Sequence, residues 1–139
     1  MPASSVLALD VGEKRVGVAL ARAEVRVPVV LKTLDRKNEN FWDRLVQICH
    51  DNDIAEIVVG LPRGLDGQDT EQTNRTREFV SELKNRLNLP VVLQDEALTS
   101  HKAKENLSAS GKSYDKSDID GLAASYILDD YLSAERAHS

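Results

Sequence analysis

Three carboxylates that lie far apart in the sequence, Asp10, Glu96 and Asp120, are the residues whose chemistry needs explaining. If the fold brings them together, they repel one another unless a cation neutralises them. Mg²⁺ is suited to that role because it prefers oxygen ligands and bridges readily to phosphates. Two such ions about 3.5 to 4 Å apart would stabilise the attacking and leaving oxygens of phosphodiester hydrolysis. We therefore expect all three residues to be catalytic metal ligands, for two Mg²⁺ or Mn²⁺ ions that activate a water nucleophile.

Asp10 lies in a segment, residues 6–21, that predicts a tight β-hairpin of two short apolar strands. If Glu13 and Lys14 form a two-residue loop, Asp10 pairs with Gly17. The same register pairs Ala8 with Ala19 and Val11 with Val16. The face around Asp10 then carries only small residues and can form a shelf for a ligand beneath the carboxylate. The alternative is that Asp10 ends a strand and is simply solvated.

Asp120 begins the apolar stripe of a helix predicted over residues 117–134. Its helical spacing places it on the face of Ala123, Ala124, Ile127, Leu128 and Tyr131. A carboxylate on a packing face lies at the rim of the core, where a cation would relieve its charge. The alternative is a capping box, in which Asp120 folds back on the amide of Ser117.

The rest of the chain alternates between strand and helix patterns. The expected elements are an edge strand over Val25 to Leu31, which contains Pro28, a helix over Phe41 to Asp51, a strand over Ala55 to Gly60, a helix over Thr70 to Leu87, a strand over Pro90 to Glu96, a helix from Thr99 or Ser100 to about Leu107, and a polar loop over Ser108 to Lys116. The first half of the Thr70 to Leu87 helix lacks an apolar stripe and is expected to face water or a polar partner.

This order predicts an α/β fold with a five-stranded mixed sheet flanked by helices. The expected strand order is 3-2-1-4-5, with strand 2 antiparallel to the others. The 139 residues allow one domain, 1–139, with a substantial core.

Composition limits the function further. The net charge is −5 and the pI is near 5.2, so a nucleic-acid partner must be held by local cations or a metal. The chain has no signal pattern and no membrane-spanning run, and its one cysteine, Cys49, lies on a helical apolar pattern. We expect a cytoplasmic protein without disulfides, with Cys49 in the core. His50, His101 and His138 are expected at the surface.

Four segments carry a resemblance to a known family: LALDVGEKRVGVALA, IVVGLPRGLDG, LPVVLQDEALTS and SDIDGLAASYILDDYL. In this order they resemble the YqgF/RuvX-like proteins, Holliday junction resolvases also implicated as pre-16S ribosomal RNA nucleases. The resemblance implies an RNase H-like fold with Asp10, Glu96 and Asp120 at the acidic metal site. It also implies that Gly60 and Thr99 lie near that site. Ala97 departs from the arginine that is usual in the family.

The candidate substrate-binding residues flank the acidic site in the predicted elements. They are Lys14, Arg15, Arg63, Arg75, Arg77, Thr99, Lys112 and Lys116. The loop before the last helix offers only two of these cations, Lys112 and Lys116, where the family is commonly rich in them. This difference lowers the expected attraction for phosphates. Any single one of these cations can instead be ordinary solvated surface.

We predict a metal-dependent endonuclease that hydrolyses phosphodiesters of structured nucleic acid. Its expected substrate is the 5′ end of pre-16S ribosomal RNA or a Holliday junction, that is, structured RNA or branched DNA. The alternative is a non-catalytic nucleic-acid or protein-binding module on the same fold, and metal binding separates the two. A phosphotransferase would need two such domains around ATP. We expect a monomer or homodimer that does not bind membranes.

Overall fold

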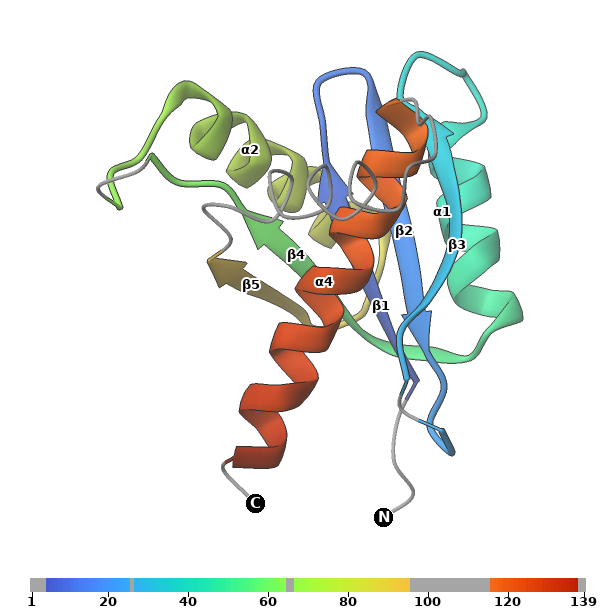
Figure 1. Ribbon diagram of the computed structural model, residues 1–139. Helices are drawn as coiled ribbons and strands as arrows, with labels where there is room; N and C mark the ends of the chain where they lie inside the picture. The colour runs from blue at the N-terminus through green and yellow to red at the C-terminus, as the bar shows by residue number, and fades with distance from the viewer. Residues whose placement is uncertain (1–4, 26, 65–66, 96–115, 138–139) are drawn as a thin grey trace.

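The computed structural model describes residues 5–25, 27–64, 67–95 and 116–137, with side chains over 121–133 in the last range. Its elements are β1 (Ser5–Val11), β2 (Arg15–Ala21), β3 (Val29–Asp35), α1 (Phe41–Asp51), β4 (Ile54–Leu61), α2 (Glu71–Arg86), β5 (Val91–Asp95) and α4 (Lys116–Ala137). In Figure 1, α4 crosses one face of the central sheet. No helix in the described ranges is long and apolar enough to span a membrane.

The sheet has the predicted strand order, β3-β2-β1-β4-β5. β2 runs antiparallel to β1 and β3, whereas β4 runs parallel to β1 and β5. The carboxyl ends of β1, β4 and β5 therefore lie at one edge of the sheet. In α/β sheets, ligands bind outside this edge.

β1 is apolar on both faces because helices cover both sides of the sheet. Leu7 and Leu9 are buried in the cluster formed with α1 and α2, whereas Val6 and Ala8 are buried in the cluster formed with α4. Successive strand residues point to opposite faces. Asp10 is two residues beyond Ala8, so it lies on the same face as Val6 and Ala8, the face that α4 covers.

The hairpin between β1 and β2 has the predicted register. The backbone N–H of Gly12 donates to the carbonyl of Arg15 at 2.8 Å and closes the turn around Glu13 and Lys14. A Cβ added at Gly12 would lie 2.8 Å from the same carbonyl oxygen, so the close approach requires glycine. The pairs are Val11 with Val16, Asp10 with Gly17 and Ala8 with Ala19.

β3 forms the predicted edge of the sheet, but its bounds differ from the prediction. The expected strand over Val25 to Leu31 begins only at Val29 and continues to Asp35, and Val25 lies in a turn. Pro28 directly precedes the strand because it has a fixed φ and no N–H for a ladder hydrogen bond. The apolar alternation before Pro28 therefore belongs to an exposed connection.

The helix predictions hold with small changes at the ends. α1 has the predicted bounds, and the chain leaves it through Asp53, which has a φ of 50°. α4 begins at Lys116, one residue inside the loop expected over 108–116. The predicted packing face of α4 is confirmed by its buried residues, Ala123, Ala124, Ile127 and Leu128. The helix expected to end near Leu107 lies outside the described residues.

The first half of α2 is largely exposed, as expected, but two of its threonines are buried. Thr73 and Thr76 are fully buried there, in line with the apolar stripe of the second half. The Thr73 hydroxyl donates to the carbonyl of Pro62 and accepts from the N–H of Thr70 in a capping box. The Thr76 hydroxyl donates to the carbonyl of Gln72 at 3.0 Å. Burial is possible because backbone groups satisfy both hydroxyls.

Cys49 is buried, as predicted for a core residue. Burial raises the pKa of its thiol to about 11, so the reactive thiolate is scarce at neutral pH. His50 is exposed, as expected, whereas His101 and His138 lie outside the described residues.

We expect Thr73→Val to destabilise the protein more than Thr76→Val. The first substitution leaves the Pro62 carbonyl without its hydroxyl donor and removes half of the capping box, which costs about 1 to 3 kcal/mol. The second removes a hydroxyl that bonds only within its own helix, and we expect a cost below about 0.5 kcal/mol. Urea denaturation of the two isosteric variants measures the difference. Equal losses would show that the contact to Pro62 does not stabilise α2.

Candidate active site

Asp10 lies at the carboxyl end of β1 with its side chain partly buried. Its cross-strand partner is Gly17, and the neighbouring pair on the same face is Ala8 with Ala19. The face around Asp10 therefore carries small residues, as predicted. Gly60 follows Val59, the β4 partner of Leu9, so it lies one strand away at the same level as Asp10.

The start of α4 lies over the same row of the sheet. Gly17 pairs with Thr33 of β3, so Asp10, Gly17 and Thr33 form one row across three strands. A Cβ added at Gly121 would lie 2.8 Å from Val30 Cγ1 and 4.0 Å from Thr33 Oγ1. Gly121 therefore places the start of α4, to which Asp120 belongs, over β3 on the sheet face that carries Asp10. The side chain of Asp120 lies outside the described residues.

Glu96 also lies outside the described residues, but its neighbour Asp95 ends β5. In the pairing of β4 with β5, Val59 pairs with Leu93 and Leu61 pairs with Asp95. Val59 is buried in the cluster formed with α1 and α2, so its partner Leu93 lies on that face of the sheet. By strand alternation Asp95 therefore lies on the face opposite Asp10. Within the described ranges, no three His, Cys, Asp or Glu side chains are grouped closely enough to hold a metal. A complete site would need Glu96 and Asp120.

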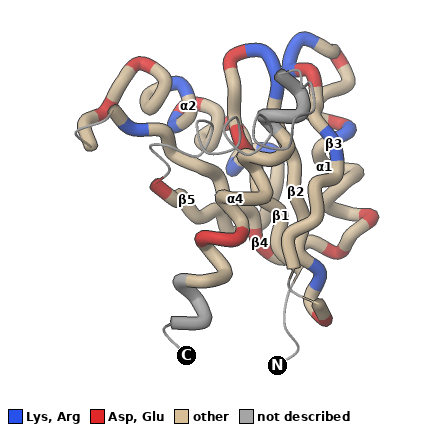
Figure 2. Tube along the Cα trace, viewed as in Figure 1, with Lys and Arg blue, Asp and Glu red and all other residues tan. Residues whose placement is uncertain are grey.

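Two candidate phosphate ligands lie at the hairpin next to Asp10. Lys14 is exposed on the turn, and Arg15 is partly buried at the start of β2. Figure 2 shows basic and acidic residues interleaved at this end of the molecule, where the β1–β2 turn, the β3–α1 loop and the start of α2 lie. Thr99 and Lys112 fall outside the described residues, and Lys116 is described only as the first residue of α4.

The candidates Arg63 and Arg77 are engaged by carboxylates. Arg63 forms an ion pair with Asp69, and its Nε lies 3.3 Å from Asp95 Oδ1. Arg77 Nη1 lies 2.5 Å from the other oxygen of Asp69. The pKa of Asp69 lies below its ordinary value, mainly because Arg77 donates this hydrogen bond. These pairs tie the β4–α2 connection to α2 and to the end of β5.

The last candidate, Arg75, is half-exposed, with Nη2 3.5 Å from Glu71 Oε2 one helical turn away. An exposed pair at this spacing is weak, so it leaves the guanidinium available to an anion.

Sequence reasoning missed Arg36, which follows β3. Its backbone N–H donates to the carbonyl of Lys14, and its Nη1 donates to the carbonyl of Gly12, both at 2.8 Å. The guanidinium lies over the ring of Phe79, 5.2 Å from the centroid. Arg36 thus holds the turn that follows Asp10. It stands in a charged stretch of the sequence, where no spacing or periodicity distinguishes it.

Comparison with known proteins confirms the predicted family. The family model of RuvX, described as a Holliday junction resolvase, matches residues 4–134. A relative from Orientia tsutsugamushi, named "Putative pre-16S rRNA nuclease", is 42% identical over 130 residues, which cover 91% of this chain and 82% of that protein. A relative of the same name from Chloroflexus aurantiacus is 37% identical over 136 residues, covering 96% of this chain and 89% of that protein.

The fold is similar to that of Thermus thermophilus RuvC. A RuvC structure in complex with a Holliday junction substrate matches with a TM-score of 0.59 and 12% identity, covering 95% of this chain and 96% of that one. A second RuvC structure matches with a TM-score of 0.55. These likenesses confirm the predicted RNase H-like fold. The family match over nearly the whole sequence, together with relatives at 42% and 37% identity, shows that the chain belongs to the RuvX family of Holliday junction resolvases.

Proposed function

We propose that this protein is a metal-dependent endonuclease that cuts structured nucleic acid at the carboxyl edge of its sheet. The observation that carries the proposal is the placement of Asp10. A partly buried carboxylate lies among small residues at the end of β1, on the face that the start of α4 crosses. Asp120 belongs to that start of α4, and Glu96 directly follows β5, whose carboxyl end lies at the same edge.

The donor chemistry of these residues fits a hard divalent cation. Carboxylate oxygens are the preferred ligands of Mg²⁺ and Mn²⁺, and the cross-strand neighbour of Asp10 is a glycine, which adds no side chain beside the carboxylate. We propose that Asp10, Glu96 and Asp120 would hold the metal, with two ions as the expected number. The bound metal would supply Lewis-acid activation of a water molecule and neutralise charge on the phosphodiester.

The chain's own residues would orient the substrate. Lys14 is exposed on the turn three positions beyond Val11, the last residue of β1, so it can attract the phosphates that flank the cut. Arg36 holds that turn in place through the carbonyls of Gly12 and Lys14. Arg63 also contacts Asp95, in an exposed ion pair that contributes little to the position of β5. The phosphate contact expected of Arg63 stays a prediction, in which a phosphate competes with Asp69 and Asp95 for the guanidinium.

The names of the relatives favour precursor ribosomal RNA as the substrate, whereas the family description and the RuvC complex favour a four-way DNA junction. Both are structured nucleic acids, and both offer phosphates to the same site. Cleavage assays on the two purified substrates with Mg²⁺ or Mn²⁺ separate them. The competing function, a binding module without catalysis, predicts binding of either substrate without cleavage.

We also propose that the protein is cytoplasmic and that it is a monomer or a homodimer.

We expect Asp10→Asn, Glu96→Gln and Asp120→Asn each to abolish hydrolysis and leave the fold intact. A neutral amide keeps the shape of the side chain and loses the charge that binds a cation. Loss of charge from an acidic cluster also relieves repulsion, so the melting temperature without metal should hold or rise. Cleavage and Mg²⁺-dependent thermal stabilisation measure the two effects. If Asp120 is instead a helix cap, Asp120→Asn should lower stability without metal.

Asp95→Asn is the matched control for Glu96→Gln. Asp95 lies on the sheet face opposite Asp10 and is 70% exposed beside Arg63. We therefore expect this variant to retain both cleavage and metal-dependent stabilisation. Loss of activity in Asp95→Asn, with Glu96→Gln active, would reverse the proposed facing of the strand. Wild-type metal dependence in all four variants would refute the metal-dependent mechanism.

We expect Lys14→Ala to weaken nucleic-acid binding and to lower the slope of log K against log salt by about 0.9 if Lys14 neutralises one duplex phosphate. The matched control is Arg22→Ala, which removes the same charge just past the opposite end of β2. Binding of a labelled duplex over a salt series, with catalysis blocked by Asp10→Asn, measures both slopes. Equal slopes for the two variants would place Lys14 outside the binding surface.

A further inference from the structure

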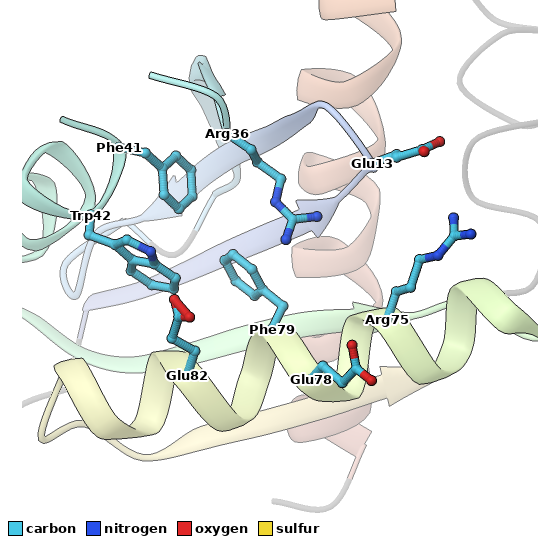
Figure 3. A pocket seen from close by; sticks show the side chains of 8 residues that line it. All are labelled: Glu13, Arg36, Phe41, Trp42, Arg75, Glu78, Phe79 and Glu82. Atoms are coloured by element: carbon cyan, nitrogen blue, oxygen red, sulfur yellow. The ribbon is translucent and has the colours of Figure 1, made fainter. Parts of the chain in front are cut away.

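A groove lies on the α1/α2 side of the sheet, around the turn that follows Asp10. It consists of two adjoining pockets of about 310 and 200 Å³ that share Glu13, Arg36 and Arg75. Its walls are the β1–β2 turn, the start of α1 and one side of α2 (Figure 3). Figure 3 shows the guanidinium groups of Arg36 and Arg75 in the space between this turn and α2.

One end of the groove is built on a column of stacked side chains. Arg86 lies over the ring of Trp42 at 4.8 Å, and Trp42 stacks on Phe79 with a centroid distance of 5.2 Å and an interplanar angle of 22°. Arg36 lies over Phe79 at 5.2 Å. The two aromatic residues are thus already in contact with each other and with the two arginines. A further planar group that enters the groove would therefore stack on Arg36, which lines the open groove.

Arg36 is a partly buried cation that lines both pockets of the groove and can bind an anion there. No carboxylate in the described part of the chain lies within ion-pair distance of it; its described contacts are the Gly12 and Lys14 carbonyls and the Phe79 ring. A guanidinium in this position can hold a phosphate by charge-assisted hydrogen bonds. It can also stack on a nucleobase through its planar face. Arg75 supplies a second cation in the same space.

The groove lies close to the proposed site of cleavage. Gly12 and Glu13 line it, and they follow Asp10 by two and three residues. Three extended residues span at most about 10 Å. The groove and Asp10 therefore lie on opposite faces of the sheet but meet at the same turn, within reach of neighbouring nucleotides of one strand.

We propose that this groove binds one unpaired nucleotide next to the phosphodiester that is cut, which rests on the proposed nuclease function. Arg36 and Arg75 hold the phosphate, and the base stacks on the guanidinium of Arg36. The groove thereby selects substrates that have a single-stranded nucleotide beside the cleavage position.

The acidic wall of the groove adds a preference among bases. Glu13, Glu78 and Glu82 line the larger pocket beside the two arginines, so we expect the phosphate at Arg36 and Arg75 and the base against the carboxylates. Carboxylates accept hydrogen bonds from exocyclic amino groups, as glutamate does from the N4 amino group of cytosine. Adenine and cytosine carry such an amino group on the Watson–Crick edge, and uracil does not. We therefore expect cytosine-rich or adenine-rich strands to bind better than uracil-rich strands.

Trp42 provides the readout, because it is the one tryptophan of the chain and lines the groove. Short single-stranded RNAs of cytosine or of uracil are titrated into the metal-free protein while tryptophan fluorescence is recorded. We expect a saturable change with the cytosine strand and weaker binding of the uracil strand. Arg75→Ala should weaken the cytosine strand about tenfold, the effect of losing a charged hydrogen bond. The control, Arg44→Ala, removes an exposed cation of α1 that does not line the groove, and should bind as the wild type does.

Asp10→Asn separates this proposal from the nuclease itself. It should lose cleavage and keep the fluorescence response, since Asp10 does not line the groove. If the wild type cleaves its substrate and shows no response, the groove assignment is wrong and the nuclease function stands. A response that survives Arg75→Ala unchanged would also overturn it. So would a response to a lysine-rich peptide and not to RNA, because the glutamates would then bind a basic protein segment.

Discussion

The register of the β1–β2 hairpin is the constraint on which the proposed site depends. Glu13 and Lys14 leave room for a two-residue turn, and that turn fixes Asp10 opposite Gly17. Side chains alternate along a strand, so a slip of one residue would move Asp10 to the α1/α2 face and away from α4. Burial on both faces of β1 opposes such a slip. The slip would move the leucines of β1 beneath α4, and the smaller Val6 and Ala8 beneath α1 and α2.

Much of the fold could be predicted because its signals are local. Turn chemistry sets the hairpin register, and helical spacing identifies the buried face of α4. The predictions from the sequence failed where the polarity of a residue did not match its burial in the structure. Val25 alternates like a strand residue but lies in a turn before Pro28, and Thr73 is buried although it is polar. The carbonyl of Pro62 satisfies that threonine, and such a partner is settled only by tertiary packing.

The candidate site could be predicted only in part, for an electrostatic reason. An acidic residue within an apolar strand is conspicuous, so Asp10 could be identified from the sequence. A cation in a polar stretch is not, because its role depends on which carboxylates the fold brings near it. Arg63 and Arg77 are bound by Asp69, whereas Arg36, which had no distinguishing pattern, holds the turn beside Asp10. Arginines that look alike in the sequence therefore have different partners in the folded protein.

The most direct test of the account is to locate the bound cation. Crystals soaked in Mn²⁺ allow the ion to be identified by its anomalous scattering without reference to activity. The account predicts Mn²⁺ beside Asp10 on the α4 face, with Glu96 and Asp120 among its ligands. Mn²⁺ bound on the opposite face, at Asp69 and Asp95, or crystals of saturated protein with no ion at Asp10, would contradict it.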